Sequence, residues 1–320
     1  MKKTRLSNFL EIEHPVLQAG LPWVSNPELV AAVSEAGGLG SLHPTAGMAA
    51  DGDVVENLRE NVRQTRRLTD RPFSVSLNLA NPAIQDLLAA VVEEGVRVVI
   101  TYGGSPALHT GYLQGNDVKV LHQVATVRHA RSAEAHGVDA IIAEGVEGGG
   151  FRGPDELTTL VLVPQVVDAV TVPVVASGGV SDARGFAAAL ALGAEGVQIG
   201  TRFVATHECI AHQRYKEAVL SAIDTGTILA GRYHLPTRLL RTDVALRLKD
   251  EVPPAKSDRA AYWEERFGIA SVRAAFLEGD LDNAVAYCAA TVGLVSEITS
   301  AAEVVQSLVE GAEAILRKGS

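Results

Sequence analysis

The stretch VPVVASGGVSDARGFAAALALGAEGVQIGTRF, residues 172–203, contains two short apolar runs separated by an alanine-rich segment. Each apolar run is rich in valine or isoleucine and is followed by glycine, which predicts a buried strand that ends in a loop. The alanine-rich segment has the composition of a helix. The stretch therefore predicts a strand, a helix and a second strand, the repeating unit of a parallel sheet covered by helices.

The same alternation occurs eight times between residues 16 and 206. The expected strands are VLQAG (16–20), LGSL (39–42), FSVSLNLA (73–80), RVVITYG (97–103), VKVLHQVA (118–125), DAIIAEG (139–145), PVVASGG (173–179) and EGVQIGTRF (195–203). Eight strand–helix units are typical of a closed barrel rather than an open sheet. We therefore predict an α/β fold of the (β/α)₈ TIM-barrel type.

The alternation ends near residue 206, where the composition of the chain changes. Residues 207–285 are helical in pattern and richer in charged and aromatic side chains. We predict that they form a small helical module, inserted after strand eight, that covers the substrate side of the barrel. Residues 286–320 are expected to form terminal helices with Ser300 as an N-cap, and to complete the barrel together with residues 1–206.

The charge and cysteine content exclude several classes of protein. The 28 basic and 38 acidic residues give a net charge of −10, and the charges are scattered along the chain. A nucleic acid or an anionic membrane would not be attracted to such a chain. Two cysteines are too few for a disulfide scaffold. The nine histidines are dispersed and no metal-binding motif is present, so no metal is expected.

Neither the N-terminus nor any apolar run has the features of a targeting or membrane segment. Acidic residues interrupt the N-terminal apolar positions, and runs such as FAAALALGA are much shorter than the roughly 20 residues that span a bilayer. We expect a soluble, cytoplasmic protein that acts on a small molecule. A homodimer is compatible with the apolar helices.

A phosphate-binding site is expected where strands seven and eight end. In barrels of this type the active site lies at the carboxyl ends of the strands, and the last two loops commonly bind phosphate. SGG (177–179) and QIGT (198–201) follow these strands. The amides of Gly179 and Gly200 and the hydroxyl of Thr201 could bind a phosphate, which the dipole of the following helix would favour. Helix caps and tight turns are the alternative explanation for single glycines.

Other polar residues at strand ends are candidates for the same site. Asn78, Gln18, Glu144 and His122 each stand at or near the end of an expected strand. Asn78 would bind a planar ring or its phosphate, or would form a turn ahead of a proline. His122 would face the barrel mouth or would be a core histidine with its hydrogen bonds satisfied.

The loop EGVEGGGFRG, residues 144–153, has three consecutive glycines followed by Phe151 and Arg152. Glycine lets the backbone approach a neighbour closely, at an entropic cost. The expected position of the loop, after strand six, suggests that this neighbour is a ligand.

The chain resembles the nitronate monooxygenase (2-nitropropane dioxygenase-like) family and its relatives, the flavin-containing enoyl-acyl carrier protein reductases. The resemblance is carried by HPVLQAGL, VSLNLA, AEGVEGGGFRG, VPVVASGGVSDARGFAAALALGAEGVQIGTRFVATHE and GLVS, and extends over nearly the whole chain. It implies non-covalently bound FMN, for which we expect NADH or NADPH as the reductant. The FMN-binding residues that it implies are Gly20, Leu21, Asn78, Glu144, Gly149, Gly150, Ser177, Gly178, Gly179, Gln198, Gly200 and Thr201.

Phe151 departs from the family pattern. The family string ends in a histidine that is regarded as the catalytic base or substrate-polarising group, whereas this chain has phenylalanine at that position. Phenylalanine can neither accept a proton nor donate a hydrogen bond. Arg152, Tyr102, His122 and Tyr233 are the candidates for a replacement donor.

Three functions are compatible with this sequence. The first is an FMN-dependent oxidoreductase that uses NAD(P)H to reduce an activated double bond, such as that of an enoyl thioester. Hydride transfer needs chiefly placement and an electrophilic carbonyl, so the missing base matters less for it. The second is oxidation of alkyl nitronates with O₂. The third is a barrel without redox chemistry that binds a phosphorylated metabolite.

Overall fold

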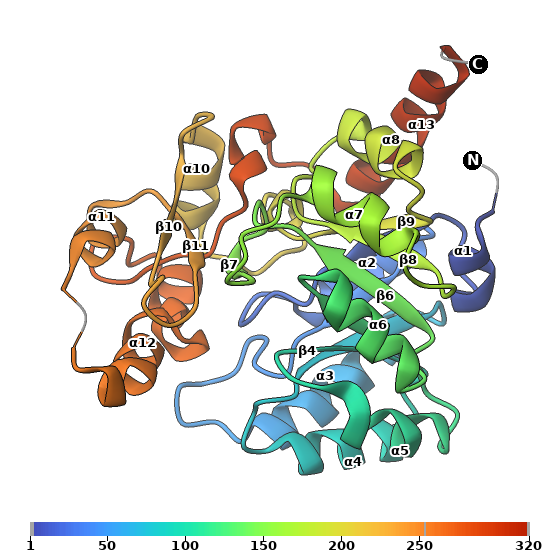
Figure 1. Ribbon diagram of the computed structural model, residues 1–320, viewed down its shortest axis with the longest axis horizontal. Coiled ribbons are helices and arrows are strands. Elements are labelled where there is room, and N and C mark those ends of the chain that lie inside the picture. The colour runs from blue at the N-terminus through green and yellow to red at the C-terminus, as the bar shows by residue number, and fades with distance from the viewer. Residues whose placement is uncertain (1–2, 253, 319–320) are drawn as a thin grey trace.

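The computed structural model describes residues 3–252 and 254–318, and its centre is a barrel of eight parallel strands (Figure 1). All eight predicted strands are confirmed. They are β1 (Val16–Gln18), β2 (Gly40–Leu42), β3 (Phe73–Asn78), β4 (Val98–Tyr102), β5 (Lys119–Val124), β6 (Ala140–Glu144), β8 (Val174–Ser177) and β9 (Gly196–Ile199).

The strands are hydrogen-bonded in the order β1-β9-β8-β6-β5-β4-β3-β2. The ring closes between β1 and β2, where Leu17 and Leu39 form a parallel bridge. At this seam Gln18 N–H donates to the Leu39 carbonyl at 2.9 Å, and Leu39 N–H donates to the Val16 carbonyl at 2.9 Å. The sheet is therefore a closed barrel, as the eight repeats predict.

Helices surround the barrel, and the C-terminal helix completes the ring. Those between strands are α2 (Pro27–Glu35), α3 (Val54–Leu68), α4 (Ile84–Glu93), α5 (Thr110–Gln114), α6 (Val127–Ala135), α7 (Thr159–Val167) and α8 (Ala183–Ala191). The C-terminal helix α13 (Ala301–Lys318) packs against α8 and α2 (Figure 1). Ser300 accepts the N–H of Glu303 at 3.2 Å, so its predicted role as an N-cap is confirmed.

The amino end of the barrel is closed by α1 (Arg5–Leu10), a short helix that the sequence pattern did not indicate. Leu6, Leu10 and Ile12 are fully buried and belong to the same apolar cluster as the inward side chains of the strands. Access to the barrel interior is therefore from the carboxyl ends of the strands.

The segment between β9 and α13, called the insertion below, forms an extra layer beside those carboxyl ends (Figure 1). Its main elements are α9 (Thr201–Val204), α10 (Gln213–Ser221), β10 (Thr227–Ala230), β11 (Thr237–Leu240), α11 (Asp243–Asp250) and α12 (Arg259–Phe267). Residues 207–285 are thus not purely helical as expected, because β10 and β11 form an antiparallel pair within them. β11 also pairs with β7 (Gly150–Phe151). The loop of residues 144–153, called the glycine loop below, therefore shares one small sheet with the insertion.

Among the described residues, no helix is both long enough and apolar enough to cross a membrane.

The contact between β2 and α2 should tolerate no side chain at Gly40. A Cβ atom there would lie 2.2 Å from the Val30 carbonyl oxygen, and backbone cannot yield as a flexible side chain can. We expect Gly40→Ala to lower the free energy of unfolding by about 1–3 kcal/mol in urea denaturation. Gly111→Ala is the matched control, because a Cβ at that helical position meets nothing within 4 Å. Equal stability of the two variants would contradict this account.

Candidate functional site

Polar side chains line the inside of the barrel at the carboxyl ends of its strands. Side chains alternate between the two faces of a strand, so every second residue points inward. Ile100, Leu121, Ile142 and Val175 belong to the apolar cluster inside the barrel. Two positions further along each strand, on the same face, stand Tyr102, Gln123, Glu144 and Ser177. The barrel interior therefore changes from apolar to polar at the end where the loops begin.

These side chains and the loops above them enclose a cavity with about 1060 Å³ of space not filled by atoms, open solvent at its mouth included. Its wall contains most of the residues predicted to form a site: Gly20, Leu21, Glu144, Gly149, Gly150, Phe151, Arg152, Ser177, Gly178, Gly179, Gln198, Gly200 and Thr201.

Asn78 does not line the cavity. Its Oδ1 accepts the N–H of Ala80 at 2.9 Å, and a Cβ at Gly103 would collide with the same oxygen. Asn78 thus folds the chain where β3 ends, which is the turn-forming role considered as the alternative.

His122 and Tyr233 also lie outside the cavity wall. His122 follows Leu121 by one residue, so it points to the opposite face of β5, where its Nδ1 is 2.8 Å from Thr101 Oγ1. Burial lowers the pKa of His122 to about 4. It is a core histidine rather than a group at the barrel mouth. The Tyr233 ring packs 5.9 Å from that of Tyr262, within the insertion.

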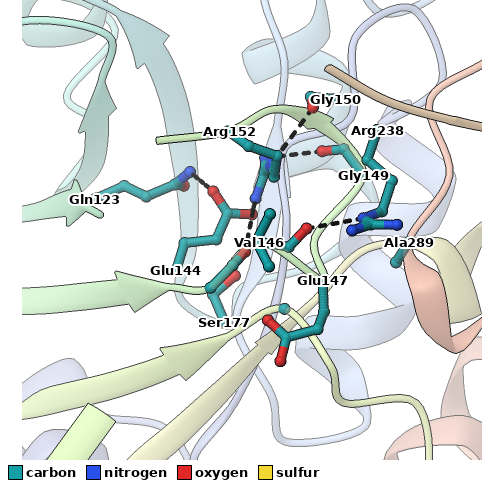
Figure 2. Close-up of polar contacts among 12 residues, drawn as sticks. Gln123, Glu144, Val146, Glu147, Gly149, Gly150, Arg152, Ser177, Arg238 and Ala289 are labelled. Carbon is teal, nitrogen blue, oxygen red and sulfur yellow. Dashed lines mark hydrogen bonds and ion pairs between the residues drawn. The ribbon is translucent and has the colours of Figure 1, made fainter. Parts of the chain in front are cut away.

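A buried ion pair between Glu144 and Arg152 organises the glycine loop (Figure 2). Arg152 Nη1 is 2.5 Å from Glu144 Oε1, and the two side chains are only 6% and 13% exposed. The guanidinium also donates to the carbonyls of Gly149 at 2.8 Å, Gly150 at 3.2 Å and Gly145 at 3.4 Å. The loop therefore wraps around Arg152, which uses most of its donors on the protein itself.

Neighbouring protein atoms leave no room for side chains at the glycines of this loop. A Cβ at Gly148 would lie 2.2 Å from Arg152 Nη1, and one at Gly149 would lie 2.9 Å from the backbone of Cys288. Gly150 has a φ of +81° and faces the Tyr287 ring. The sequence analysis predicted a ligand as the neighbour of these glycines, and the structure shows that protein atoms are close neighbours of them.

Two further contacts hold the loop in place. The Glu147 carboxylate accepts the N–H of Thr159 at 2.9 Å and its hydroxyl at 3.0 Å, at the first turn of α7. Arg238 from β11 donates to the Val146 carbonyl at 2.8 Å (Figure 2). The loop is thus fixed from the barrel side and from the insertion side.

Phe151 lies where the glycine loop meets the insertion. Its ring centroid is 4.8 Å from that of Trp263 and 5.4 Å from that of Tyr287, and its backbone pairs with Thr237 of β11. Such tilted aromatic pairs contribute about 0.5–1.5 kcal/mol each beyond the burial of area. Phe151 therefore helps to join the insertion to the barrel while one side of it lines the cavity.

The two glycine loops predicted to bind phosphate also line the cavity, and Gly178 lies against the loop of residues 144–153, where a Cβ atom on it would be 3.0 Å from the Gly145 carbonyl oxygen. Gly178 and Gly179 both have positive φ, +81° and +71°, which only glycine adopts readily. Asp182 caps α8 through Arg184 N–H at 2.9 Å, so a helix begins next to these loops as expected. Thr201 Oγ1 accepts the N–H of Ala289 at 2.9 Å, which links the loop after β9 to the segment before α13.

Tyr102 and His43 form a pair that motif reasoning does not single out. Tyr102 lines the cavity, and its hydroxyl is 3.2 Å from Nε2 of the buried His43. His43 follows β2 directly, without any glycine motif around it. The contact between these two residues cannot be predicted from the sequence, because β3 lies between β2 and β4 in the barrel.

A closed (β/α)₈ barrel with a glycine-lined cavity at the carboxyl ends of its strands defines the class of this protein. The model of the nitronate monooxygenase family matches residues 3–311, and the chain belongs to this family. It is an oxidoreductase. This assignment agrees with the resemblance that the sequence motifs indicate.

Relatives in the family have different named activities. A (3aS,4S,5R,7aS)-5-hydroxy-7a-methyl-1-oxo-octahydro-1H-indene-4-carboxyl-CoA dehydrogenase from Mycobacterium tuberculosis is 37% identical over 251 residues, 77% of this chain and 68% of that protein. A probable nitronate monooxygenase from Staphylococcus saprophyticus is 34% identical, over 71% of this chain and 75% of that protein.

Two solved structures are similar over nearly the whole chain. FabK from Thermotoga maritima has a TM-score of 0.91 and 38% identity, covering 99% of this chain and 98% of that one. Nitroalkane oxidase from Streptomyces ansochromogenes has a TM-score of 0.82 and 27% identity, covering 98% and 99%.

Removing Arg152 should destabilise the protein in a pH-dependent way. Burial raises the pKa of Glu144, and Arg152 opposes that rise. In Arg152→Gln the carboxylate loses its partner, so we expect a loss of about 3–5 kcal/mol at pH 7. Below the pKa of the unfolded chain Glu144 is neutral in both states, so the loss should shrink toward pH 4 and grow as the pH rises.

Urea denaturation at several pH values measures this difference. Arg184→Gln is the control, because Arg184 pairs with Asp182 on the surface and its side chain is 72% exposed. Surface pairs contribute about 0–1 kcal/mol. A loss at Arg152 that is independent of pH would contradict the assigned role of Glu144.

Proposed function

We propose that this protein is an FMN-dependent oxidoreductase that uses NADH or NADPH to reduce an activated double bond, with an enoyl thioester-like compound as acceptor. The observation that carries the proposal is the composition of the cavity wall. Within the described part of the chain, no histidine lines the cavity, and its titratable groups are Tyr102, Glu144, Arg152, Tyr215 and Tyr287. Such a wall suits hydride transfer better than removal of a proton from a neutral substrate.

The residues present fit FMN. The phosphate would be held by the loops that contain Gly178, Gly179, Gly200 and Thr201, all of which line the cavity. The planar ring would lie toward Gly20 and the glycine loop. FMN, when bound, would supply the acceptance and donation of hydride. The chain's own contribution would be to bind and orient the ligands and to exclude water.

The charges and the apolar residues of the cavity wall support the same proposal. Glu144 and Arg152 form an ion pair, and the Arg152 guanidinium also donates to the Gly149 carbonyl. The wall near the insertion is apolar and aromatic, with Phe151, Ile269 and Phe276. It would accommodate the hydrocarbon part of an acyl group. A CoA thioester is part of the substrate name of the mycobacterial relative, which supports a thioester acceptor here.

Oxidation of alkyl nitronates with O₂ is the second candidate. The family description and the staphylococcal relative favour it. A nitronate is already deprotonated, so Phe151 would not prevent its oxidation. A non-redox barrel for a phosphorylated metabolite is the third, and the glycine loops are the feature that supports it.

Absorption spectroscopy separates these functions. We expect the purified protein to carry FMN or to bind it when incubated with it. Protein that stays colourless after incubation with FMN would exclude both flavin functions. NADH or NADPH should bleach the flavin under anaerobic conditions, and an enoyl thioester should restore its colour. Bleaching by a nitronate together with no response to either nucleotide would contradict the reductase.

Restoring a base at position 151 should change substrate choice. Phe151→His would place an imidazole at the wall of the cavity, where general-base catalysis typically contributes about 10²–10⁴-fold. We expect faster oxidation of neutral nitroalkanes, measured by oxygen uptake, and little change with preformed nitronates, which serve as the control. An unchanged nitroalkane rate in a folded variant that binds FMN would count against the role assigned to Phe151.

A further inference from the structure

The pair formed by His43 and Tyr102 has a defined direction. Thr45 N–H donates to His43 Nδ1 at 3.2 Å, and Thr45 Oγ1 lies 2.9 Å from the same nitrogen. Because a backbone N–H can only donate, Nδ1 is an acceptor and carries no hydrogen. Trp23 N–H donates to Thr45 Oγ1 at 3.0 Å, which leaves the threonine hydrogen free to point at Nδ1 as well.

The hydrogen of the neutral imidazole therefore resides on Nε2, which donates to the Tyr102 hydroxyl oxygen at 3.2 Å. Burial lowers the pKa of His43 to about 3, so the ring is neutral at physiological pH. Burial, together with the nearby Glu144, raises the pKa of Tyr102, so its hydroxyl is also neutral. The phenolic hydrogen of Tyr102 then points away from His43.

The other tyrosines and the arginine of the cavity wall direct their donors at the protein. Tyr215 donates to the Tyr287 carbonyl at 2.6 Å, and Tyr287 donates to the Phe267 carbonyl. Arg152 binds Glu144 and the loop carbonyls. His43 is the hydrogen-bond partner of the Tyr102 hydroxyl, and it acts as donor there. The phenolic hydrogen is thus available to a ligand in the cavity.

We propose that Tyr102 donates this hydrogen bond to the carbonyl oxygen of a bound acyl thioester, and that His43 is the positioning residue that orients it. The choice of ligand rests on the proposed function. A hydrogen bond at that oxygen polarises the carbonyl and stabilises the negative charge that develops there when the conjugated double bond accepts hydride. Tyr102 would take over the polarising role that the histidine at position 151 is considered to have in the family.

The test compares wild-type protein with Tyr102→Phe, and uses Tyr112→Phe, an exposed tyrosine on α5, as the control. The probe is butyryl-CoA labelled with ¹³C at its carbonyl, a saturated thioester that cannot be reduced. Difference infrared spectroscopy should show a lowered carbonyl frequency on the wild type and the control, and a frequency near the solution value on Tyr102→Phe. Equal frequencies on all three proteins would overturn the proposal.

Binding and turnover give a second measure. Tyr102→Phe should bind butyryl-CoA about 2- to 10-fold more weakly, as expected for one neutral hydrogen bond. It should reduce crotonyl-CoA with a kcat about 10²-fold lower, as expected for loss of one donor at a developing oxyanion. His43→Leu should lower kcat more than it raises KM, because the hydroxyl remains but is no longer oriented. A wild-type kcat in Tyr102→Phe would overturn the proposal.

The tautomer of His43 is tested without any substrate. Long-range ¹H–¹⁵N correlation spectra of the protein labelled at histidine should show His43 neutral with hydrogen on Nε2, assigned by comparison with His43→Leu. Hydrogen on Nδ1 would overturn the proposal whatever the reaction is. A wild-type protein that binds no thioester would contradict the proposed function, and the thioester as ligand of Tyr102, while the tautomer result still decides the orientation of the pair.

Discussion

The buried ion pair between Glu144 and Arg152 is the interaction on which the site depends. Taking two charges out of water is costly, and the cost is offset only if the remaining donors and acceptors are also satisfied. Arg152 meets this requirement by drawing three loop carbonyls around its guanidinium, and Gln123 donates to Glu144. The loop from Gly145 to Gly150 is therefore shaped by its contacts with Arg152, and the absence of a side chain at Gly148 follows from that shape, because a Cβ atom there would collide with the guanidinium.

The same loop connects the barrel to its insertion. Directly after the glycines, β7 pairs with β11, and Phe151 packs between Trp263 and Tyr287. The insertion enters the chain between β9 and α13, at the carboxyl ends of the strands, so it can only cover the end where the cavity opens. The two-residue strand β7 therefore links the ion pair and the cavity wall to the insertion.

The barrel could be predicted because each strand carries its own pattern of apolar residues, and most of the cavity wall followed because parallel strands end on the same side. The orientation of single side chains could not be predicted from the sequence. His122 and Gln123 are neighbours at the end of β5, and only the register of the barrel decides which of them faces inward. β10 and β11 were missed because their pairing with each other and with β7 is a tertiary contact. The contacts of Arg152 were missed because the loop must first fold back on itself.

Two of the groups beside the cavity, His43 and Tyr102, stay uncharged near neutral pH. Burial lowers the pKa of His43, raises that of Tyr102 and, against the effect of Arg152, raises that of Glu144. A reaction that needs a side chain to take up a proton at pH 7 would find no imidazole in the described wall. A reaction in which a hydride moves between bound ligands needs fixed dipoles and exclusion of water instead. This is the physical basis of the proposal of hydride transfer, and it does not depend on the identity of the substrate.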